Sequence, residues 1–234
     1  MSALREKPDV QELRRIALLL LACLPVFLVF RMQVKYWVNI PIWDEWDTPG
    51  RTLLHFAQGK LAWSDFWAQH NESRKVFPRL IYLAINGPFG WDVRYGMVLT
   101  SLIAGTVSVF FLRQLRDPGM RSSGGVLFAW LLINFLLFGP SQSENYLCGY
   151  TFEILIPVLA LCGCIAVNLS GRPLVYKVLW NSVLAIIATF SFAHGMILWL
   201  LGLPIPATQE TARPRWIRRW AFYLLVYGLV GALT

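Results

Sequence analysis

Residues 16–31 read IALLLLACLPVFLVFR, and residues 41–49 read PIWDEWDTP. The first stretch is an apolar run of the kind that forms a membrane-spanning helix, which needs about 20 predominantly apolar residues. The second stretch places three carboxylates within four positions, beside two tryptophans. Because carboxylates are costly near lipid, such a group next to a membrane span indicates chemistry or cation binding.

Apolar runs recur along the chain, which is 56% hydrophobic and only 15% charged. A soluble domain carries about 25% charged residues, so we predict an all-α membrane protein with about seven transmembrane helices. A further run at 80–91 is too short to cross unaided and is broken by Gly87-Pro88. The predicted spans cover about residues 16–31, 95–113, 124–139, 151–169, 174–192, 195–208 and 220–234.

Clusters of arginine and lysine predict the orientation of these spans, because positive residues collect in short cytoplasmic loops. If the spans alternate, every cluster falls on one side, provided that 174–203 is divided into two legs at 191–195. The N-terminus is then cytoplasmic, and the loops that hold most other polar residues are extracytoplasmic. The clusters are Arg5, Lys7, Arg14 and Arg15; Arg113, Arg116 and Arg121; Arg172 and Lys177; and Arg213, Arg215, Arg218 and Arg219.

Residues 1–234 are predicted to form a single transmembrane module. Residues 1–15 precede the first span, 32–79 form the first extracytoplasmic loop, and 80–234 hold the remaining spans. Because the last apolar run continues to the final residue, we expect either that further sequence follows it or that the chain is a minimal form of the module. The net charge of +8 comes from the clusters at span ends rather than from a basic domain, so we expect no nucleic-acid partner.

The first outer loop has a helical pattern of its own. Thr48-Pro49 is typical of a helix start, with a capping hydroxyl and then proline at the first helical position. Apolar residues recur at helical spacing up to Leu61, which predicts an amphipathic helix lying on the membrane. A second short helix is expected to begin at Ser64-Asp65 and to carry Phe66 and Trp67.

Asp44, Glu45 and Asp47 have three interpretations. The simplest is a solvated turn that caps the following helix, because aspartate is common near helix starts. Asp44 and Glu45 also suit a divalent cation such as Mg²⁺ or Mn²⁺, which prefers hard oxygen ligands. The third is a general base, because a carboxylate between Trp43 and Trp46 can have its pKa raised by desolvation. Asp44 is the favoured catalytic residue, with Glu45 or Asp47 assisting.

A second polar group lies just before the chain re-enters the membrane. It contains an imidazole, an amide, an acid and several cations. Arginine binds phosphate in bidentate fashion, so its arginines are candidate ligands for a phosphate leaving group. Lys75 is instead expected to extend to lipid headgroups. The candidate substrate-binding residues of this group are His70, Asn71, Glu72, Arg74 and Arg79.

Two more places on the predicted outer side hold polar residues. Gln142, Glu144 and Asn145 lie in one loop and are candidate substrate-binding residues. Glu153, inside the fourth span, must be paired or hydrated, either in a structural hydrogen bond or in a site. His194 lies in the turn between the two legs and is either an interhelical hydrogen-bonding residue or a substrate contact.

An anchor helix, an outer loop that opens with Asp44-Glu45, interfacial helices and further spans together resemble the C-type (GT-C) membrane glycosyltransferases. These include oligosaccharyltransferases, protein mannosyltransferases and aminoarabinose transferases. The resemblance implies a polyprenyl-phosphate-linked sugar donor, inversion at the anomeric carbon and an acidic base or metal ligand at Asp44-Glu45. It also implies a bacterial inner membrane location with the active face periplasmic or extracellular.

We therefore expect a glycosyltransferase-like module whose partners are a polyprenyl-phosphate sugar donor, membrane lipids and a glycan, lipid or protein acceptor. The alternative is a non-catalytic scaffold of the same fold that binds lipid or glycan. A transporter is less favoured, because the predicted spans hold few charged residues beyond Glu153. The cofactor considered is a divalent cation, Mg²⁺ or Mn²⁺.

Overall fold

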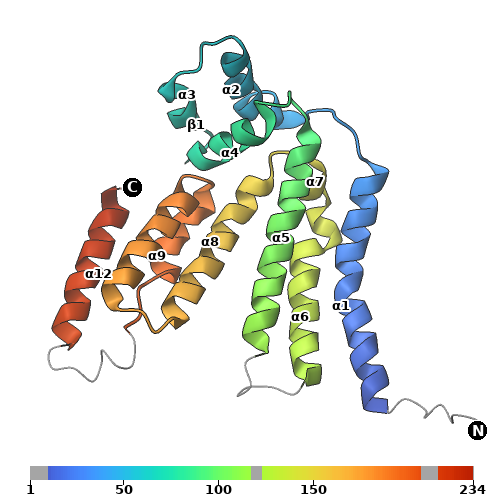
Figure 1. Ribbon diagram of the computed structural model, residues 1–234, viewed down its shortest axis with the longest axis vertical. Helices are drawn as coiled ribbons and strands as arrows, with labels where there is room; N and C mark the ends of the chain where they lie inside the picture. Colours follow the sequence, from blue (N-terminus) through green and yellow to red (C-terminus); the bar gives the residue numbers. More distant parts are fainter. Residues whose placement is uncertain (1–9, 117–122, 207–215, 234) are drawn as a thin grey trace, which may run out of the picture. The chain divides into compact units, whose positions relative to one another are not determined.

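The computed structural model describes residues 10–116, 123–206 and 216–233 (Figure 1). The chain divides into two compact units. The first contains Met1–Val38 and Ala104–Leu147, and the second contains Asn39–Ile103 and Cys148–Thr234. Most of the 1–15 segment lies outside the described residues, as do five cations used to predict orientation: Arg5, Lys7, Arg121, Arg213 and Arg215.

Four helical segments are long and apolar enough to cross a membrane. They confirm the prediction of an all-α membrane protein, and by the same measure the described residues hold four such spans rather than seven. In the third segment, helix α6 is followed by a 3-10 turn, η2, and then by α7. The four segments are α1 (Val10–Lys35), α5 (Val93–Leu115), Gly124–Leu147 and α8 (Phe152–Leu169). The segment Gly124–Leu147 contains most of α6 (Ser123–Phe138), together with η2 (Pro140–Gln142) and α7 (Ser143–Leu147).

Two of the remaining predicted spans are short or interrupted. Helix α9 (Leu174–Thr189) has 16 residues, about 24 Å at 1.5 Å per residue, against a hydrocarbon core of about 30 Å. The prediction of a span over 195–208 is wrong, because η3 (Ala193–Ile197) and α10 (Leu198–Leu201) end at Gly202 and residues 203–206 are not helical. Prolines at 204 and 206 explain the early end, since proline lacks the N–H that a helix needs. The last described helix is α12 (Trp216–Leu233).

The predicted division of residues 174–203 into two legs is confirmed. Helix α9 ends at Thr189, and the Ser191 hydroxyl donates to Ile187 O over 2.6 Å. The chain then turns back so closely that a Cβ at Gly195 would overlap the Ala188 carbonyl oxygen. Glycine is therefore needed at the turn.

In the first unit, α1 packs along α6 and a buried amide fixes their register. Asn134 is 0% exposed, and its Nδ2 donates to Ala22 O over 2.8 Å. Its Oδ1 accepts the hydroxyl proton of Ser108 over 2.5 Å. At the other end of α1, Gln33 Nε2 donates to Tyr146 O over 2.8 Å. Such polar bonds between apolar helices add specificity that dispersion contacts alone do not supply.

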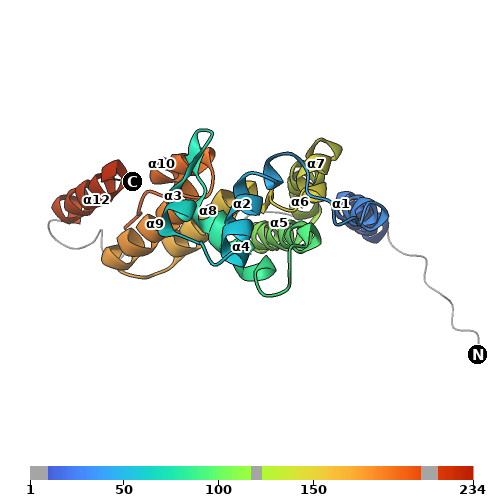
Figure 2. The same cartoon turned by 90° about the horizontal axis from the view of Figure 1, so that it is seen from above.

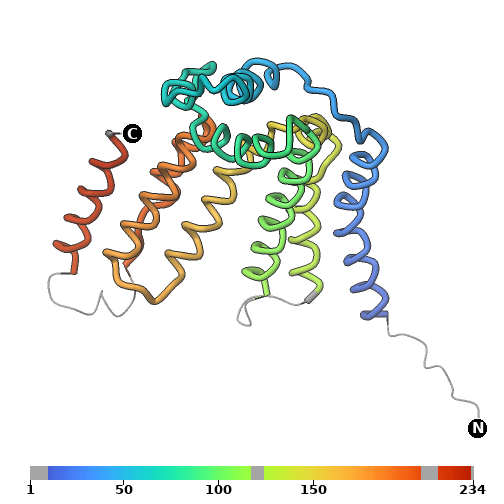
Figure 3. The backbone as a smooth tube through the Cα atoms, turned by 45° about the horizontal axis from the view of Figure 1, so that its top comes forward, coloured from blue at the N-terminus to red at the C-terminus, as the bar shows by residue number. Residues whose placement is uncertain are grey.

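In the second unit, residues 43–86, most of which belong to the predicted loop 32–79, form a set of short elements over one end of α8 and α9 (Figures 2 and 3). Both helices predicted in this loop are present, and the backbone N–H of Phe77 donates to Phe190 O over 3.3 Å. This bond ties the start of α4 to the turn after α9. The elements are η1 (Trp43–Glu45), α2 (Thr48–Ala57), α3 (Trp63–Trp67), strands β1 (Gln69–His70) and β2 (Ser73–Arg74), and α4 (Val76–Asn86).

Aromatic packing joins these short elements to α8. The rings of Tyr82 and Tyr150 lie 5.4 Å apart between centroids, and Tyr150 and Phe152 lie 5.7 Å apart. The segment before α8 also lies against α5, since a Cβ at Gly96 would overlap the carbonyl oxygen of Gly149. The second unit therefore holds residues 148–153 firmly beside the outer loop.

Lys177, which belongs to one of the predicted cation clusters, is buried in the protein. It is 1% exposed, and its Nζ donates to Asn168 O over 2.8 Å and to Ile205 O over 2.9 Å. Asn181 Nδ2 adds a bond of 2.8 Å to Gly202 O. These bonds satisfy carbonyl groups that proline and chain breaks leave unpaired, and they hold the segment after α10 against α8 and α9.

Candidate functional site

The acidic turn separates its three carboxylates. Residues 43–45 form η1, and α2 begins at Thr48. Glu45 is 1% exposed, whereas the side chains of Asp44 and Asp47 are 63% and 73% exposed. Only Asp44 and Asp47 are thus open to a substrate from solvent.

Glu45 supports the turn from inside. Its Oε2 accepts the backbone N–H of Ile42 over 2.9 Å, and its Oε1 lies close to Gly149, where a Cβ would be 2.8 Å away. Burial raises the pKa of Glu45 above its ordinary value, although the hydrogen bond from Ile42 partly opposes the shift. The position of Glu45 indicates a structural group at the floor of the turn.

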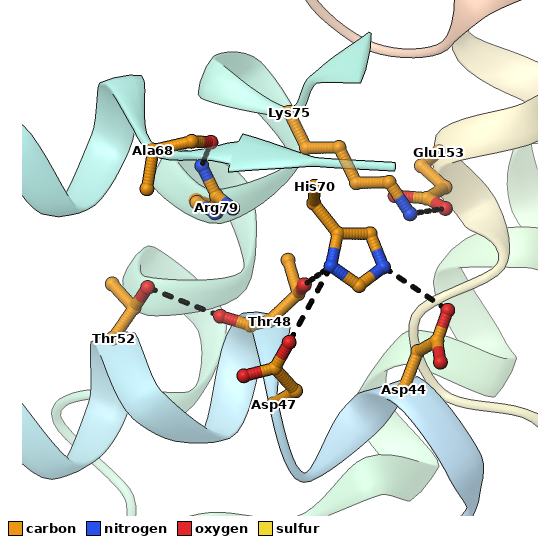
Figure 4. A network of polar contacts seen from close by, with 9 residues as sticks. All are labelled: Asp44, Asp47, Thr48, Thr52, Ala68, His70, Lys75, Arg79 and Glu153. Atoms are coloured by element: carbon orange, nitrogen blue, oxygen red, sulfur yellow. Dashed lines mark hydrogen bonds and ion pairs between the residues drawn. The ribbon is translucent and has the colours of Figure 1, made fainter. Parts of the chain in front are cut away.

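Asp44 is held by a histidine from another part of the loop (Figure 4). His70 Nε2 lies 3.0 Å from Asp44 Oδ2, and His70 Nδ1 lies 2.6 Å from the hydroxyl of Thr48. Asp47 Oδ2 is 3.6 Å from the same Nδ1. With an ionised Asp44 and a neutral imidazole, Nε2 must donate to Asp44 and Nδ1 must accept from Thr48. The three residues then form one directed row of hydrogen bonds.

Thr48 differs from its expected role. The sequence predicts a capping hydroxyl, but neither Asp47 nor Thr48 makes a side-chain bond that caps α2. The Thr48 hydroxyl is instead engaged with His70. Capping therefore does not account for the acidic turn.

His70 lies on a short hairpin whose strands have two residues each. The sequence identified His70 as a candidate but did not indicate the hairpin. Gln69 pairs with Arg74 and His70 with Ser73 across strands β1 and β2. The turn residue Asn71 has φ 50, a left-handed conformation that asparagine adopts more readily than most residues. Asn71 is therefore suited to the turn that places His70 beside Asp44.

Arg79 is a buried residue that makes structural hydrogen bonds. It is 4% exposed, and its Nη1 donates to Phe66 O over 3.0 Å and to Ala68 O over 2.6 Å. These carbonyls end α3 and have no helical partner. The arrangement does not fit the expected role of Arg79 as a phosphate ligand, whereas Arg74 is exposed on β2.

Lys75 and Glu153 form a buried ion pair. Lys75 Nζ lies 2.6 Å from Glu153 Oε1, and both residues are 5% exposed. The expectation that Lys75 extends to lipid headgroups is therefore wrong. The sequence indicated that Glu153 needs a partner, but nothing local identified a lysine 78 positions earlier.

A cavity of about 380 Å³ lies between the acidic turn, the hairpin and the start of α8. Its wall is rich in carboxylates and aromatic rings, and both residues of the described chain with positive φ other than glycine, Trp43 and Asn71, lie on it. Left-handed backbone in bulky residues is rare and concentrates at functional sites. The lining residues are Trp43, Asp44, Glu45, Asn71, Glu72, Ser73, Lys75, Cys148, Tyr150, Thr151, Glu153, Ile154 and Phe192.

Four other candidate residues are not among the residues that line this cavity. Gln142, Glu144 and Asn145 belong to the first unit, where Asn145 Nδ2 donates to Gln142 Oε1 over 2.6 Å, whereas the cavity belongs to the second unit. His194 is exposed in η3, with its ring centroid 5.0 Å from that of the lining residue Phe192. It borders the site without lining it.

No preformed metal centre accompanies the acidic turn. In the part of the chain that the structure describes, no group of three or more His, Cys, Asp or Glu side chains is placed to hold a metal ion. Asp44 is engaged with His70 and Glu45 with Ile42, so the two carboxylates proposed as shared ligands have different partners. Comparison of the chain with known protein families, curated protein sequences and solved structures found no match.

Proposed function

We propose that this chain is a glycosyltransferase module of the C-type class that takes a sugar from a polyprenyl-phosphate donor. In this proposal Asp44 is the general base and His70 orients it. The chain would lie in a bacterial inner membrane with a cytoplasmic N-terminus, and the cavity would open on the extracytoplasmic side. The acceptor would be a glycan, lipid or protein hydroxyl or amine.

The observation that carries the proposal is the Thr48–His70–Asp44 row at the edge of a cavity beside a membrane span. A general base must be oriented and open to the group that it deprotonates. Asp44 meets both requirements, since His70 fixes one carboxylate oxygen and the side chain remains 63% exposed. Glu45, being buried, fits support of Asp44 better than proton transfer.

The donor phosphate requires a positive partner. Arg79 donates to backbone carbonyls and Lys75 is paired with Glu153. Arg74 is therefore the remaining candidate phosphate ligand among the residues predicted from the sequence. Alternatively, Mg²⁺ or Mn²⁺ would neutralise the donor phosphate, with Asp44 as the protein residue that would hold the ion. Chelation by EDTA separates the two, because only the second requires a divalent ion for turnover.

The test uses the purified full chain in lipid nanodiscs with polyprenyl phosphates that carry radiolabelled glucose, mannose, galactose, arabinose or glucosamine. Release of free polyprenyl phosphate measures transfer to any acceptor, including water. Asp44→Asn should lower the rate about 10²–10⁴-fold, the usual contribution of general acid–base catalysis. Glu12→Gln, which removes an exposed carboxylate in the first turn of α1, should leave it unchanged. Turnover by Asp44→Asn at the wild-type rate would exclude Asp44 as the base.

A non-catalytic scaffold is the second candidate. It is favoured by the structural use of Arg79 and Lys75, which leaves few free cations to stabilise a departing phosphate. A scaffold would bind polyprenyl phosphate with equal affinity in the wild type and in Asp44→Asn and release no labelled sugar. Weaker binding by Arg74→Ala would be common to both candidates, so sugar release decides between them.

A further inference from the structure

The deep end of the cavity contains buried polar atoms that lack partners. Tyr150 is 3% exposed and Glu153 is 5% exposed, and the Tyr150 hydroxyl and Glu153 Oε2 have no hydrogen-bond partner. A buried polar atom without a partner costs free energy, which a ligand can recover by supplying the missing bond. Because a carboxylate only accepts, the ligand must bring O–H or N–H donors to Glu153.

The charge of the wall favours a cation over an anion. Four carboxylates line the cavity, those of Asp44, Glu45, Glu72 and Glu153, whereas among the described lining residues Lys75 carries the only basic group. The Lys75 ammonium is already paired with Glu153 at 2.6 Å. A phosphate or carboxylate entering this cavity would meet uncompensated negative charge, and a protonated amine would be attracted.

The mouth of the cavity provides the position for such an amine. Asp44, Glu72 and Trp43 line the cavity and are exposed, Trp43 by 69% of its surface. The rings of Tyr150 and Phe192 already face Lys75 Nζ, at 5.5 and 5.6 Å. Trp43 is therefore the aromatic face that remains for a second cation, and tryptophan is the most favourable ring for a cation–π contact.

We infer that the cavity binds a polyhydroxylated ligand with a protonated amine, its ammonium between Asp44, Glu72 and Trp43 and its hydroxyls directed to Tyr150 and Glu153. An amino sugar has this chemistry. Its role as transferred sugar or acceptor rests on the proposed function, but its binding does not. The lipid phosphate, by the same charge argument, remains outside the cavity.

The test compares three sugars with the same ring and different charge: glucosamine, glucose and glucuronate. Their binding to the full chain in nanodiscs is measured by isothermal titration calorimetry, at a pH where the amine is protonated and with EDTA present. Glucosamine should bind at least about tenfold more tightly than glucose, a factor equal to about 1.4 kcal/mol, and glucuronate more weakly than both. Rising salt should reduce the difference, because the interaction is screened.

Two variants locate the amine. Glu72→Gln, on an exposed hairpin turn, should weaken glucosamine about tenfold without changing the affinity for glucose, and Glu12→Gln should change neither. Equal affinities for the three sugars, tighter binding of glucuronate, no measurable binding of glucosamine, or an equal effect of Glu72→Gln on glucosamine and glucose would each overturn the inference. Glucosamine binding without sugar release would leave the inference intact and remove the proposed function. Sugar release that depends on Asp44, together with equal binding of glucosamine and glucose, would support the proposed function and overturn the inference.

Discussion

Lys75 Nζ lies 2.6 Å from Glu153 Oε1, and this buried pair joins the residue before α4 to the first turn of α8. The two residues are 78 positions apart in the chain. Their bond therefore fixes the hairpin and α4 against the membrane-spanning part of the second unit, and it forms one wall of the cavity.

The first prediction concerns this pair. Lys75→Met leaves the Glu153 carboxyl group buried without the ammonium that pairs with it, which should lower the free energy of unfolding by about 1–5 kcal/mol, the upper end applying if the group keeps its charge. The double variant Lys75→Met with Glu153→Gln should lose much less, because it leaves no buried ionisable group without a partner. Reversible unfolding of each variant in mixed micelles measures both values. Equal losses in the single and double variants would show that the pair contributes little coupling.

The second prediction separates the two arginines near the hairpin. Arg79→Ala removes two hydrogen bonds from a charged donor to the carbonyls of Phe66 and Ala68, each worth about 1.5–3 kcal/mol. It should lower the free energy of unfolding by about 3–6 kcal/mol, whereas Arg74→Ala, at an exposed position, should change it by less than about 0.5 kcal/mol.

The matched measurement is binding of polyprenyl phosphate to the same two variants. Arg74→Ala should weaken binding while remaining folded. If Arg79→Ala kept wild-type stability and lost only polyprenyl phosphate binding, the phosphate role first expected for Arg79 would be restored.

Much of the fold could be predicted from the sequence because the deciding interactions are local. An apolar run sets the position of a membrane helix within a few residues, as for residues 151–169 and α8. The break after α9 could be predicted as well, because only two legs over 174–203 place every cation cluster on one side, and glycine at 195 permits the close turn. The prediction of a helix over 195–208 was wrong because α10 ends at Leu201 and prolines at 204 and 206 prevent its continuation, although the stretch is apolar.

The site could be predicted only as a set of polar groups near one another. Asp44 and His70 were both identified, but their bond joins residues 26 positions apart, and no local pattern specifies such a pair. The hairpin that presents His70 has strands of two residues each, too short to show an alternating pattern. Lys75 was misassigned for a related reason, since its partner Glu153 becomes evident only after the chain has folded. The bonds from Arg79 to the carbonyls of Phe66 and Ala68 could not be predicted from the sequence for the same reason.

The third prediction uses two glycines of one helix. In α5, a Cβ at Gly96 would overlap the carbonyl oxygen of Gly149, whereas a Cβ at Gly105 would meet no atom within 4 Å. Gly96→Ala should therefore displace the segment that carries Tyr150 and destabilise the protein by about 1–3 kcal/mol. Gly105→Ala should stabilise it by about 0.5–1 kcal/mol, the gain of alanine over glycine inside a helix. Thermal unfolding in one detergent compares them, and shifts of the same sign would contradict the close approach.

The fourth prediction concerns pH and the two acids Glu45 and Asp92, whose pKa values shift in opposite directions. Burial raises the pKa of Glu45 above its ordinary value of 4.5, and the hydrogen bond from Arg94 lowers that of Asp92 below 3.8. Above pH 4.5 the folded state retains on Glu45 a proton that the unfolded chain releases, so this carboxyl group destabilises the fold increasingly as pH rises towards its folded pKa. Asp92 does the opposite, since its stabilising contribution is complete above pH 3.8 and declines as pH falls.

Glu45→Gln should consequently gain stability relative to wild type as pH rises from 4.5 to 7, because the amide oxygen can still accept the Ile42 N–H without carrying charge. Asp92→Asn should be less stable than wild type throughout this range, because it removes the carboxylate that binds Arg94 at 2.6 Å. Urea unfolding at several pH values gives both differences. If the difference in free energy of unfolding between Glu45→Gln and wild type stayed constant across this range, Glu45 would ionise in the folded protein as it does in the unfolded chain. Its burial would then have no electrostatic consequence.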